Sequence, residues 1–272
     1  MKNAVEKIII GCSRAGSLTN IVPISETSAM WGECLEFGIN RFDTANIYAQ
    51  GDSERALAAF RKKYRDSQMV ITTKVGFSHG QMSMLVRTLK PILSPLVTWR
   101  RHGTGQALRA RAKVEKQDFS QEQLLVDAAA SQKRLQVSIL DSLLLHDPKV
   151  DDLLSGEVEL FFDRVLDREI CRRVGVSVNT RDELKAASSL DAVSEVQVPL
   201  SLWSEIENGE LVDKLLARQV KFSVRQIGQH ESYKISPFEE TLPSLLSDHR
   251  VDGVLLGLSS RTSFQELIKI LD

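Results

Sequence analysis

The 272-residue sequence has few cysteines, no long apolar run and almost no net charge. Its three cysteines, Cys12, Cys34 and Cys171, are scattered without metal or redox spacing, which favours a reducing compartment. No window reaches the roughly 18 apolar residues of a membrane span, and the polar amino terminus lacks the apolar core of a signal peptide. A net charge of -1 creates no field that attracts nucleic acid or membranes. We therefore expect a cytoplasmic protein that binds neither of them.

Two motifs that would place the chain in other classes are also absent. A doubly wound open sheet that binds a dinucleotide has Gly-x-Gly-x-x-Gly after its first strand, but residues 11–16 read Gly-Cys-Ser-Arg-Ala-Gly. A metal-dependent barrel hydrolase needs His-x-His near the first strand, which this sequence lacks. The doubly wound open sheet is therefore the weaker of two fold hypotheses, and no metal site is predicted. The five histidines are dispersed, at His79, His102, His146, His230 and His249.

The sequence does contain a regular alternation of predicted strands and helices, with 42% hydrophobic and 26% charged residues. Because each helix connects two strands that must then run in parallel, the pattern predicts a single α/β domain over residues 1–272. The expected fold is a (β/α)8 TIM barrel with its active site at the carboxyl ends of the strands. Strands are predicted over residues 7–11, 39–43, 69–74, 138–145, 173–178, 193–200, 220–225 and 251–256. Helices are predicted over residues 25–37, 53–64, 157–167, 209–217 and 262–271, and from residues 120, 180 and 236.

Capping signals support three of these helix starts. Two of them match a capping box, and the third has a serine N-cap followed by proline and, later, glutamate. The residues are Ser120 with Gln123, Thr180 with Glu183, and Ser236 with Pro237 and Glu239.

Four ionisable side chains are predicted to meet at the carboxyl end of the barrel. Asp43 ends the second predicted strand, Lys74 the third and His146 the fourth, while Tyr48 lies in the loop after the second. Each has an ordinary structural explanation by itself, since an aspartate caps turns, a tyrosine packs half-buried, a strand-end lysine extends into solvent and a histidine begins a turn. Independent placement of all four on one rim is much less frequent, so the cluster indicates a functional site.

This combination suits acid catalysis by a phenol. The tyrosine pKa of about 10 is too high for an efficient acid at neutral pH, and a nearby ammonium is expected to lower it by stabilising the phenolate. Asp43 keeps Lys74 charged and in place, and a neutral His146 imidazole can hold a substrate carbonyl. Such a set delivers a proton to an oxygen that becomes negative as hydride reaches its carbon. Because no side chain supplies hydride, a nicotinamide cofactor is needed.

Six segments carry a family resemblance that spans nearly the whole chain. In order, they are Phe-Asp-Thr-Ala-Asn-Ile-Tyr (42–48), Ile-Thr-Thr-Lys-Val-Gly (71–76), Leu-Leu-Leu-His-Asp-Pro (143–148), Val-Gly-Val-Ser-Val (174–178), Glu-Val-Gln-Val-Pro-Leu (195–200) and Leu-Gly-Leu-Ser-Ser (256–260). In these segments the sequence resembles the aldo-keto reductase family. The resemblance implies Tyr48 as general acid or base, Lys74 tuning its pKa, Asp43 paired with Lys74, and His146 orienting the substrate.

The resemblance also implies where a nicotinamide cofactor binds. Ser177 and Gln197 would hold the nicotinamide carboxamide, although a strand-end serine and a satisfied core amide are the alternative interpretations. Gly257, Ser259 and Ser260 would line the adenosine-phosphate end, where the start of the last helix also favours an anion. The two serines could instead simply cap that helix.

Several positions depart from the family's pattern. Val178 follows Ser177 at a place where asparagine is frequent. On the seventh strand, where many members stack an aromatic ring on the nicotinamide, this chain has Arg225, which could stack, contact a phosphate or face solvent. Arg261 could supply a charge for a 2′-phosphate. We therefore expect NADP as the cofactor, with NAD as the alternative.

A long segment, residues 77–118, separates the third strand from its helix and is expected over the active-site rim. It contains eight basic residues and two acidic ones. Three interpretations stay open: a lid over an anionic ligand, a solvated loop, or a small helix that docks a partner. The basic residues are Arg87, Lys90, Arg100, Arg101, Arg109, Arg111, Lys113 and Lys116.

Two functional hypotheses follow. The first is an NADP-dependent oxidoreductase that reduces an aldehyde or ketone to an alcohol, with a sugar or polyol among the small-molecule substrates. The same residues would run the oxidation in reverse, with Tyr48 as the base. The alternative is a cofactor-binding regulatory or docking barrel with little turnover. The complete set of four residues favours turnover, whereas the basic segment is compatible with docking.

Overall fold

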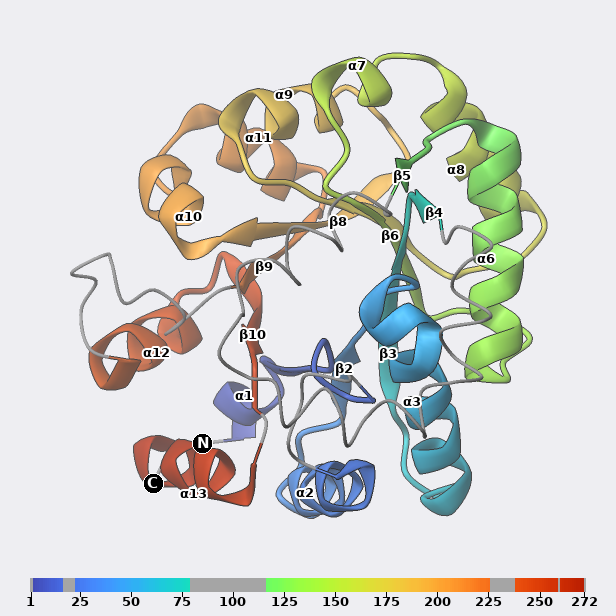
Figure 1. Cartoon of the computed structure of the whole chain (residues 1–272). Coiled ribbons are helices and arrows are strands. Elements are labelled where there is room, and N and C mark those ends of the chain that lie inside the picture. Colours follow the sequence, from blue (N-terminus) through green and yellow to red (C-terminus); the bar gives the residue numbers. More distant parts are fainter. Residues whose placement is uncertain (1, 17–22, 79–115, 226–237, 259, 272) are drawn as a thin grey trace, which may run out of the picture.

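Eight parallel strands form a closed barrel at the centre of the molecule (Figure 1). The computed structural model describes residues 2–16, 23–78, 116–225, 238–258 and 260–271. Ile8 on the first strand pairs with Val254 on the last and closes the barrel, so the predicted (β/α)8 TIM barrel is confirmed. In order around the barrel, the strands are β1 (Ile8–Gly11), β2 (Arg41–Asp43), β3 (Val70–Val75), β6 (Ser142–His146), β7 (Val174–Ser177), β8 (Val193–Pro199), β9 (Lys221–Arg225) and β10 (Val251–Leu256).

Helices surround the barrel as an outer layer (Figure 1). No helix in the described ranges is long and apolar enough to cross a membrane. The helices that follow the strands are α2 (Ile24–Glu36), α3 (Asp52–Lys63), α6 (Gln121–Leu135), α8 (Glu157–Asp167), α9 (Arg181–Ala187), α11 (Glu210–Ala217), α12 (Phe238–Ser247) and α13 (Arg261–Leu271). Shorter ones are α1 (Lys2–Val5), the 3-10 helix η1 (Tyr48–Gly51), α7 (Val150–Leu153) and α10 (Leu200–Ile206).

An aromatic cluster anchors the helices on either side of β2. Trp31 on α2 packs edge to face against Phe42 on β2 and Phe60 on α3, with ring centroids 5.9 and 5.3 Å away. Phe42 and Phe60 are themselves 5.7 Å apart. All three side chains are buried, and such pairs stabilise a core beyond the area that they bury. The cluster therefore fixes the position of β2 and of the loop that follows it.

Most predicted boundaries lie close to the observed ones, and α8 and β10 match their predictions at both ends. The strand predicted from residue 138 begins only at Ser142, because Leu140 forms no more than an isolated bridge with Cys171. Helix α10 was not expected, since its residues directly continue an apolar strand. The differences arise where an apolar run does not reveal where one element stops and the next begins.

The predicted helix caps have different outcomes. Glu183 donates its backbone N–H to Thr180 Oγ1 at 3.2 Å, which confirms the capping box of α9. The capping box predicted at residue 120 is wrong, because the Ser120 hydroxyl donates to Asp118 Oδ1 at 2.7 Å and makes no cap hydrogen bond. The signal at residues 236 and 237 lies outside the described residues.

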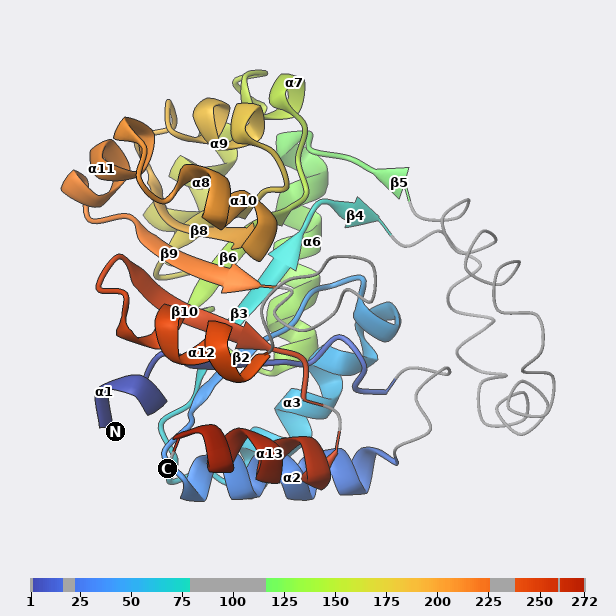
Figure 2. The ribbon, with the colours of Figure 1, turned by 90° about the vertical axis from the view of Figure 1, so that its left-hand side faces the viewer.

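A small antiparallel hairpin stands at the carboxyl end of the barrel. Strand β4 (Phe77–Ser78) pairs with β5 (Lys116–Gln117). Figure 2 shows this hairpin on the side toward which the arrowheads of β9 and β10 point. The two strands are the ends of the basic segment predicted over residues 77–118. Residues 79–115 lie outside the described ranges, so Lys116, which is exposed, is the one basic residue of that segment that the structure describes.

Candidate active site

The side chains predicted at the strand ends lie together at the carboxyl end of the barrel. His146, Ser177 and Gln197 are in register across β6, β7 and β8. Asp43 ends β2, and Lys74 lies one residue before the end of β3. Because neighbouring parallel strands bring equivalent positions side by side, residues far apart in the sequence share one rim.

A buried ion pair between Lys74 and Asp43 lies at the base of this site. The Lys74 ammonium contacts Asp43 Oδ1 and donates a hydrogen bond to the Thr44 carbonyl at 3.1 Å. Burial alone would lower the pKa of Lys74, but the charge of Asp43, the nearby Tyr48 and the hydrogen bond to Asp43 together outweigh burial, and the pKa is raised. Lys74 is therefore positively charged at neutral pH. Both side chains are only 2% exposed, and removing one partner of such a pair costs about 3–5 kcal/mol.

Tyr48 packs its ring between this ion pair and His146. The Lys74 Nζ atom is 5.2 Å from the Tyr48 ring centroid, and the His146 ring is 5.6 Å away at an interplanar angle of 88°. Burial raises the pKa of Tyr48, whereas the Lys74 charge lowers it, and the net shift is upward. This net direction is opposite to the lowering that the sequence predicted, because burial outweighs the ammonium. At neutral pH the phenol is protonated and can donate.

His146 is held in its neutral form. Burial, the charge of Lys74 and the charge of Arg225 together keep the pKa of His146 well below its usual value. Its Nδ1 is buried and has no hydrogen-bond partner among the described residues. A neutral imidazole with an unpaired ring nitrogen can form a hydrogen bond with a ligand.

The loop that carries Tyr48 is tied to its neighbours by hydrogen bonds. The hydroxyls of Thr44 and Ser53 are 2.8 Å apart, and Ser53 Oγ donates to the Cys12 carbonyl at 2.8 Å. The Cys12 N–H in turn donates to the Asp43 carbonyl at 2.8 Å. The loop after β2 is therefore fixed both to the end of β1 and to the start of α3.

Asn46, two residues before Tyr48, connects the same loop to the hairpin and to α6. Its Nδ2 donates to the Phe77 carbonyl at 2.8 Å and to Asp127 Oδ2 at 3.3 Å. Its backbone N–H donates to the Lys74 carbonyl at 2.9 Å. Asp127 is 8% exposed, and burial raises its pKa to about 6. The sequence pattern does not reveal this pair, and the signal that it contains is an aspartate close to the apolar side of a predicted helix.

The hairpin also contacts the site directly. The Phe77 ring lies 5.0 Å from the His146 ring at 78°. From the other strand, Gln117 Nε2 donates to the carbonyls of His146 and Asp147 at 3.3 and 3.1 Å. The two ends of the basic segment are therefore part of the rim on which His146 stands.

The buried amide of Gln197 is oriented by Asp43. Its Nε2 donates to Asp43 Oδ2 at 2.7 Å, which leaves Oε1 buried and without a hydrogen-bond partner in the described part of the chain. Ser177 is in register with Gln197 on β7 and is 1% exposed. An unpaired buried acceptor is costly unless a ligand satisfies it, and the carboxamide of a nicotinamide has N–H groups to donate. The residues present therefore fit such a group.

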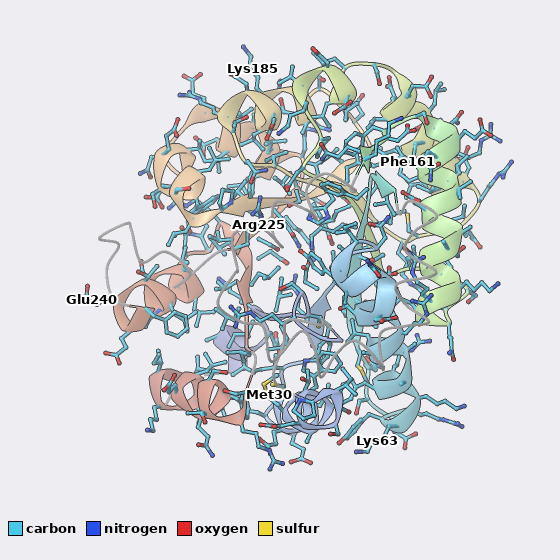
Figure 3. All side chains as sticks on the ribbon, viewed as in Figure 1. Met30, Lys63, Phe161, Lys185, Arg225 and Glu240 are labelled. Atoms are coloured by element: carbon cyan, nitrogen blue, oxygen red, sulfur yellow. The ribbon has the colours of Figure 1, made fainter. Side chains whose placement is uncertain are left out.

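Arg225, at the end of β9, crosses the rim toward β7. Its Nη2 donates to the Val178 carbonyl at 3.1 Å and to Asn179 Oδ1 at 2.6 Å. It also lies 3.5 Å from Asp147 Oδ1, and its side chain is 14% exposed. Figure 3 shows Arg225 inside the ring of helices, whereas the labelled surface charges point outward. The solvent-facing interpretation is therefore wrong.

The residues predicted for the adenosine-phosphate end lie at the start of α13. Gly257 follows β10 and is exposed. The Ser263 N–H donates to Ser260 Oγ at 3.2 Å, and the Ser260 N–H donates to Ser263 Oγ at 3.2 Å. Ser260 therefore caps α13, which is the structural alternative to a role at the adenosine-phosphate end. Ser259 lies outside the described residues.

Arg261 is the first residue of α13 and reaches the neighbouring helix α2. Its Nη2 is 2.6 Å from Glu33 Oε1, and its side chain is 55% exposed. Figure 2 shows the two helices side by side. The cation predicted for a 2′-phosphate is therefore accessible, but an acidic side chain already pairs with it.

Solved structures share the fold of this chain. The chain is similar to the aldo-keto reductase AKR11C1 from Bacillus halodurans (holo form), with a TM-score of 0.71 at 19% identity, over 98% of this chain and 86% of that one. It is also similar to the glycerol dehydrogenase AKR11B4 from Gluconobacter oxydans, with a TM-score of 0.65 at 13% identity, over 98% and 86%. At these identities the similarity establishes the fold alone, which is that of a TIM barrel.

Sequence comparison then gives the family. Residues 7–230 match the model of the aldo/keto reductase family, and the chain belongs to that family. A curated relative is the D-threo-aldose 1-dehydrogenase of Pseudomonas sp, which is 26% identical over 187 residues. The match covers 68% of this chain and 53% of the relative, so the matched region spans about half of the relative's length.

Proposed function

We propose that this protein reduces an aldehyde or ketone to an alcohol with NADPH, and that Tyr48 is the general acid. The cluster of Asp43, Lys74, Tyr48 and His146 carries the proposal, because it places a protonated phenol beside a permanent cation and a neutral imidazole. Membership of the aldo/keto reductase family supports carbonyl reduction. The curated relative is named for an aldose and one structural neighbour for glycerol, so sugars and polyols form the first substrate class to test.

The proposed mechanism divides the work among these four residues. His146 orients the carbonyl oxygen by donating a hydrogen bond from its neutral imidazole, and Tyr48 transfers its proton to that oxygen as negative charge develops there. Lys74 stabilises the resulting phenolate, while Asp43 keeps Lys74 charged and in place. A reduced nicotinamide, when bound, supplies the hydride. For oxidation Tyr48 would need to be ionised, which its raised pKa disfavours at neutral pH.

The same proposal assigns the cofactor residues. Gln197 would accept a hydrogen bond from the nicotinamide carboxamide through its unpaired Oε1, with Ser177 beside it. Gly257, Ser259 and Ser260 would line the adenosine-phosphate end. The choice of NADP over NAD rests on Arg261, which is accessible at the start of α13.

Tyr48→Phe tests the role of the phenol. We expect kcat for carbonyl reduction to fall by about 10²–10⁴, while the NADPH affinity stays unchanged because the ring is retained. The measurements are NADPH consumption with a panel of aldoses, other aldehydes and ketones, and a fluorescence titration with NADPH. Tyr64→Phe, which removes the phenol of the residue directly after α3, is the matched control and should retain full activity.

The outcomes separate the two functional hypotheses. Unchanged turnover in Tyr48→Phe would remove Tyr48 from its proposed role. Tight NADPH binding without turnover of any carbonyl compound in the panel would favour a cofactor-binding docking barrel instead. If neither NADPH nor NADH binds at sub-millimolar concentration, the reductase proposal fails despite the four residues.

A further inference from the structure

Arg225 brings a second positive charge to the reacting end of the barrel. Its guanidinium contacts the residues that directly follow two members of the site: Asp147 after His146, and Val178 after Ser177. Its side chain is 14% exposed, so water screens its charge only partly. In agreement with this position, burial, Lys74 and then Arg225 lower the pKa of His146. The field of Arg225 therefore acts where substrate and cofactor would react.

The two cations of the site differ in how far they are neutralised. Lys74 is in direct contact with the buried Asp43 carboxylate. Arg225 makes its hydrogen bonds to neutral oxygens instead, those of the Val178 carbonyl and the Asn179 amide.

In the described part of the chain, Arg225 has one ion-pair partner, Asp147. The Arg225 Nη2 atom is 3.5 Å from Asp147 Oδ1, and the Asp147 side chain is 33% exposed. The Arg225 Nε is buried and has no hydrogen-bond partner among the described residues. The positive charge of Arg225 is therefore only partly compensated.

Charge is also what distinguishes the two states of a nicotinamide, because the oxidised ring is a cation and the reduced ring is neutral. We propose that Arg225 makes this site select the reduced cofactor over the oxidised one, and so adapts the protein to reduction. This inference rests on the proposed function and deepens it, since the charge of Arg225 and the protonated Tyr48 would favour the same direction. At an effective dielectric constant of about 20, a unit charge within about 10 Å disfavours a second like charge by roughly a factor of ten.

The selection acts on binding and leaves the equilibrium of the overall reaction unchanged. A nicotinamide that has given up its hydride would be a cation, and the Arg225 charge would weaken the binding of that oxidised product. An alcohol oxidation would instead begin with the form that Arg225 disfavours. The charge of Arg225 therefore disfavours oxidation, which is the reaction for which the curated aldose dehydrogenase is named.

The test is the ratio of the dissociation constants for NADP+ and NADPH, measured calorimetrically without substrate. We expect the wild-type protein to bind NADPH at least about ten-fold more tightly. Arg225→Gln should reduce this ratio by roughly ten-fold, chiefly through tighter NADP+ binding, whereas Arg225→Lys keeps the charge and should keep the ratio. Asp147→Asn removes the partial counter-charge and should raise the ratio. Asparagine suits this position because Asp147 has a φ of 55°.

Each result supports or overturns the inference. An unchanged ratio in Arg225→Gln would overturn it, and so would equal weakening of both nucleotides, which would make Arg225 an ordinary contact residue. If both nucleotides bind and the ratio of their dissociation constants is the same in the variants as in the wild-type protein, the inference fails and the proposed function stands. If neither nucleotide binds to the wild-type protein, both fail together.

Discussion

The protonation states of individual side chains in this site are determined by the competition between burial and neighbouring charge. Burial moves the pKa of Tyr48 up and that of His146 down, so both side chains are uncharged at neutral pH. Lys74 has its own carboxylate and stays charged in spite of burial. A protonated phenol, a neutral imidazole and one lysine cation therefore coexist within a few ångströms. This is the protonation state that proton donation to a carbonyl oxygen requires.

Asp127 shows the cost of burying a carboxylate that accepts hydrogen bonds from uncharged amide groups. Burial raises its pKa from 3.8 to about 6, although hydrogen bonds from Gln123 and the Gly76 amide oppose the shift. The folded protein thus holds this proton more tightly than the unfolded chain. The resulting stabilisation is fully present below pH 3.8 and is lost as the pH rises through about 6. A shift of about two pKa units corresponds to roughly 3 kcal/mol at most.

We predict that Asp127→Asn removes this pH dependence. The free energy of unfolding of the variant, relative to wild type, should rise by up to roughly 3 kcal/mol between pH 4 and pH 8. Urea denaturation at a series of pH values measures the difference. Asp163→Asn, at an exposed position on α8, is the control and should follow the wild-type curve. A constant difference between Asp127→Asn and wild type would contradict the prediction.

At the scale of elements, the turn after Tyr48 depends on Gly51. Ala49, Gln50 and Gly51 are all left-handed, with φ of 50°, 60° and 82°. A Cβ on Gly51 would lie 2.6 Å from Arg134 Cδ and 2.9 Å from Arg134 Nε. This arginine cannot easily move, because its Nε pairs with the fully buried Glu54. The turn that positions Tyr48 is therefore packed directly on an ion pair between α3 and α6.

We predict that Gly51→Ala destabilises the protein by about 2–4 kcal/mol and lowers kcat, because it combines backbone strain with displacement of a buried ion pair. Gly156→Ala is the matched control, since Gly156 has a similar φ of 78° with nothing within 4 Å of the added methyl group. It should cost only the backbone strain, about 1–2 kcal/mol, and leave kcat intact. Thermal unfolding and steady-state kinetics measure both effects. Equal costs at the two positions would contradict the prediction.

The contact between α13 and α2 bears on the choice of cofactor. Arg261 pairs with Glu33 across the two helices, so a 2′-phosphate must compete with a carboxylate for the same guanidinium. We predict that Arg261→Ala weakens NADPH binding roughly ten-fold and leaves NADH binding unchanged. Glu33→Gln should do the reverse and tighten NADPH binding alone. Parallel titrations with both nucleotides measure this, and equal effects on NADPH and NADH would remove Arg261 from its proposed role.

For the whole molecule, the barrel and the rim could be predicted because they follow from alternation. Each predicted helix connects parallel strands, and the ends of those strands gather Asp43, Lys74 and His146 whatever the exact boundaries are. The short hairpin of β4 and β5 could not be predicted, since two-residue strands have no periodicity to detect.

The missed parts of the site depend on contacts between distant segments. Asn46 and Asp127 meet only because α6 packs beside the loop after β2, and the direction of Arg225 is decided by the oxygens of Val178 and Asn179. The net pKa shift of Tyr48 cannot be predicted from the sequence for the same reason. Its sign depends on how deeply the ring is buried, which the neighbouring lysine in the sequence pattern does not reveal.

The junction between β1 and β10 also determines the order in which the polypeptide can fold. Ile8 to Ile10 pair with Val254 to Leu256, so β1 leaves the ribosome long before its pairing partner β10. Until then, one edge of the nascent sheet has unpaired backbone groups, and such edges recruit other chains. Closing so long a loop is also a slow, entropically costly step. Until β10 is translated, the unpaired edge of β1 is therefore a place where the growing chain can misassemble.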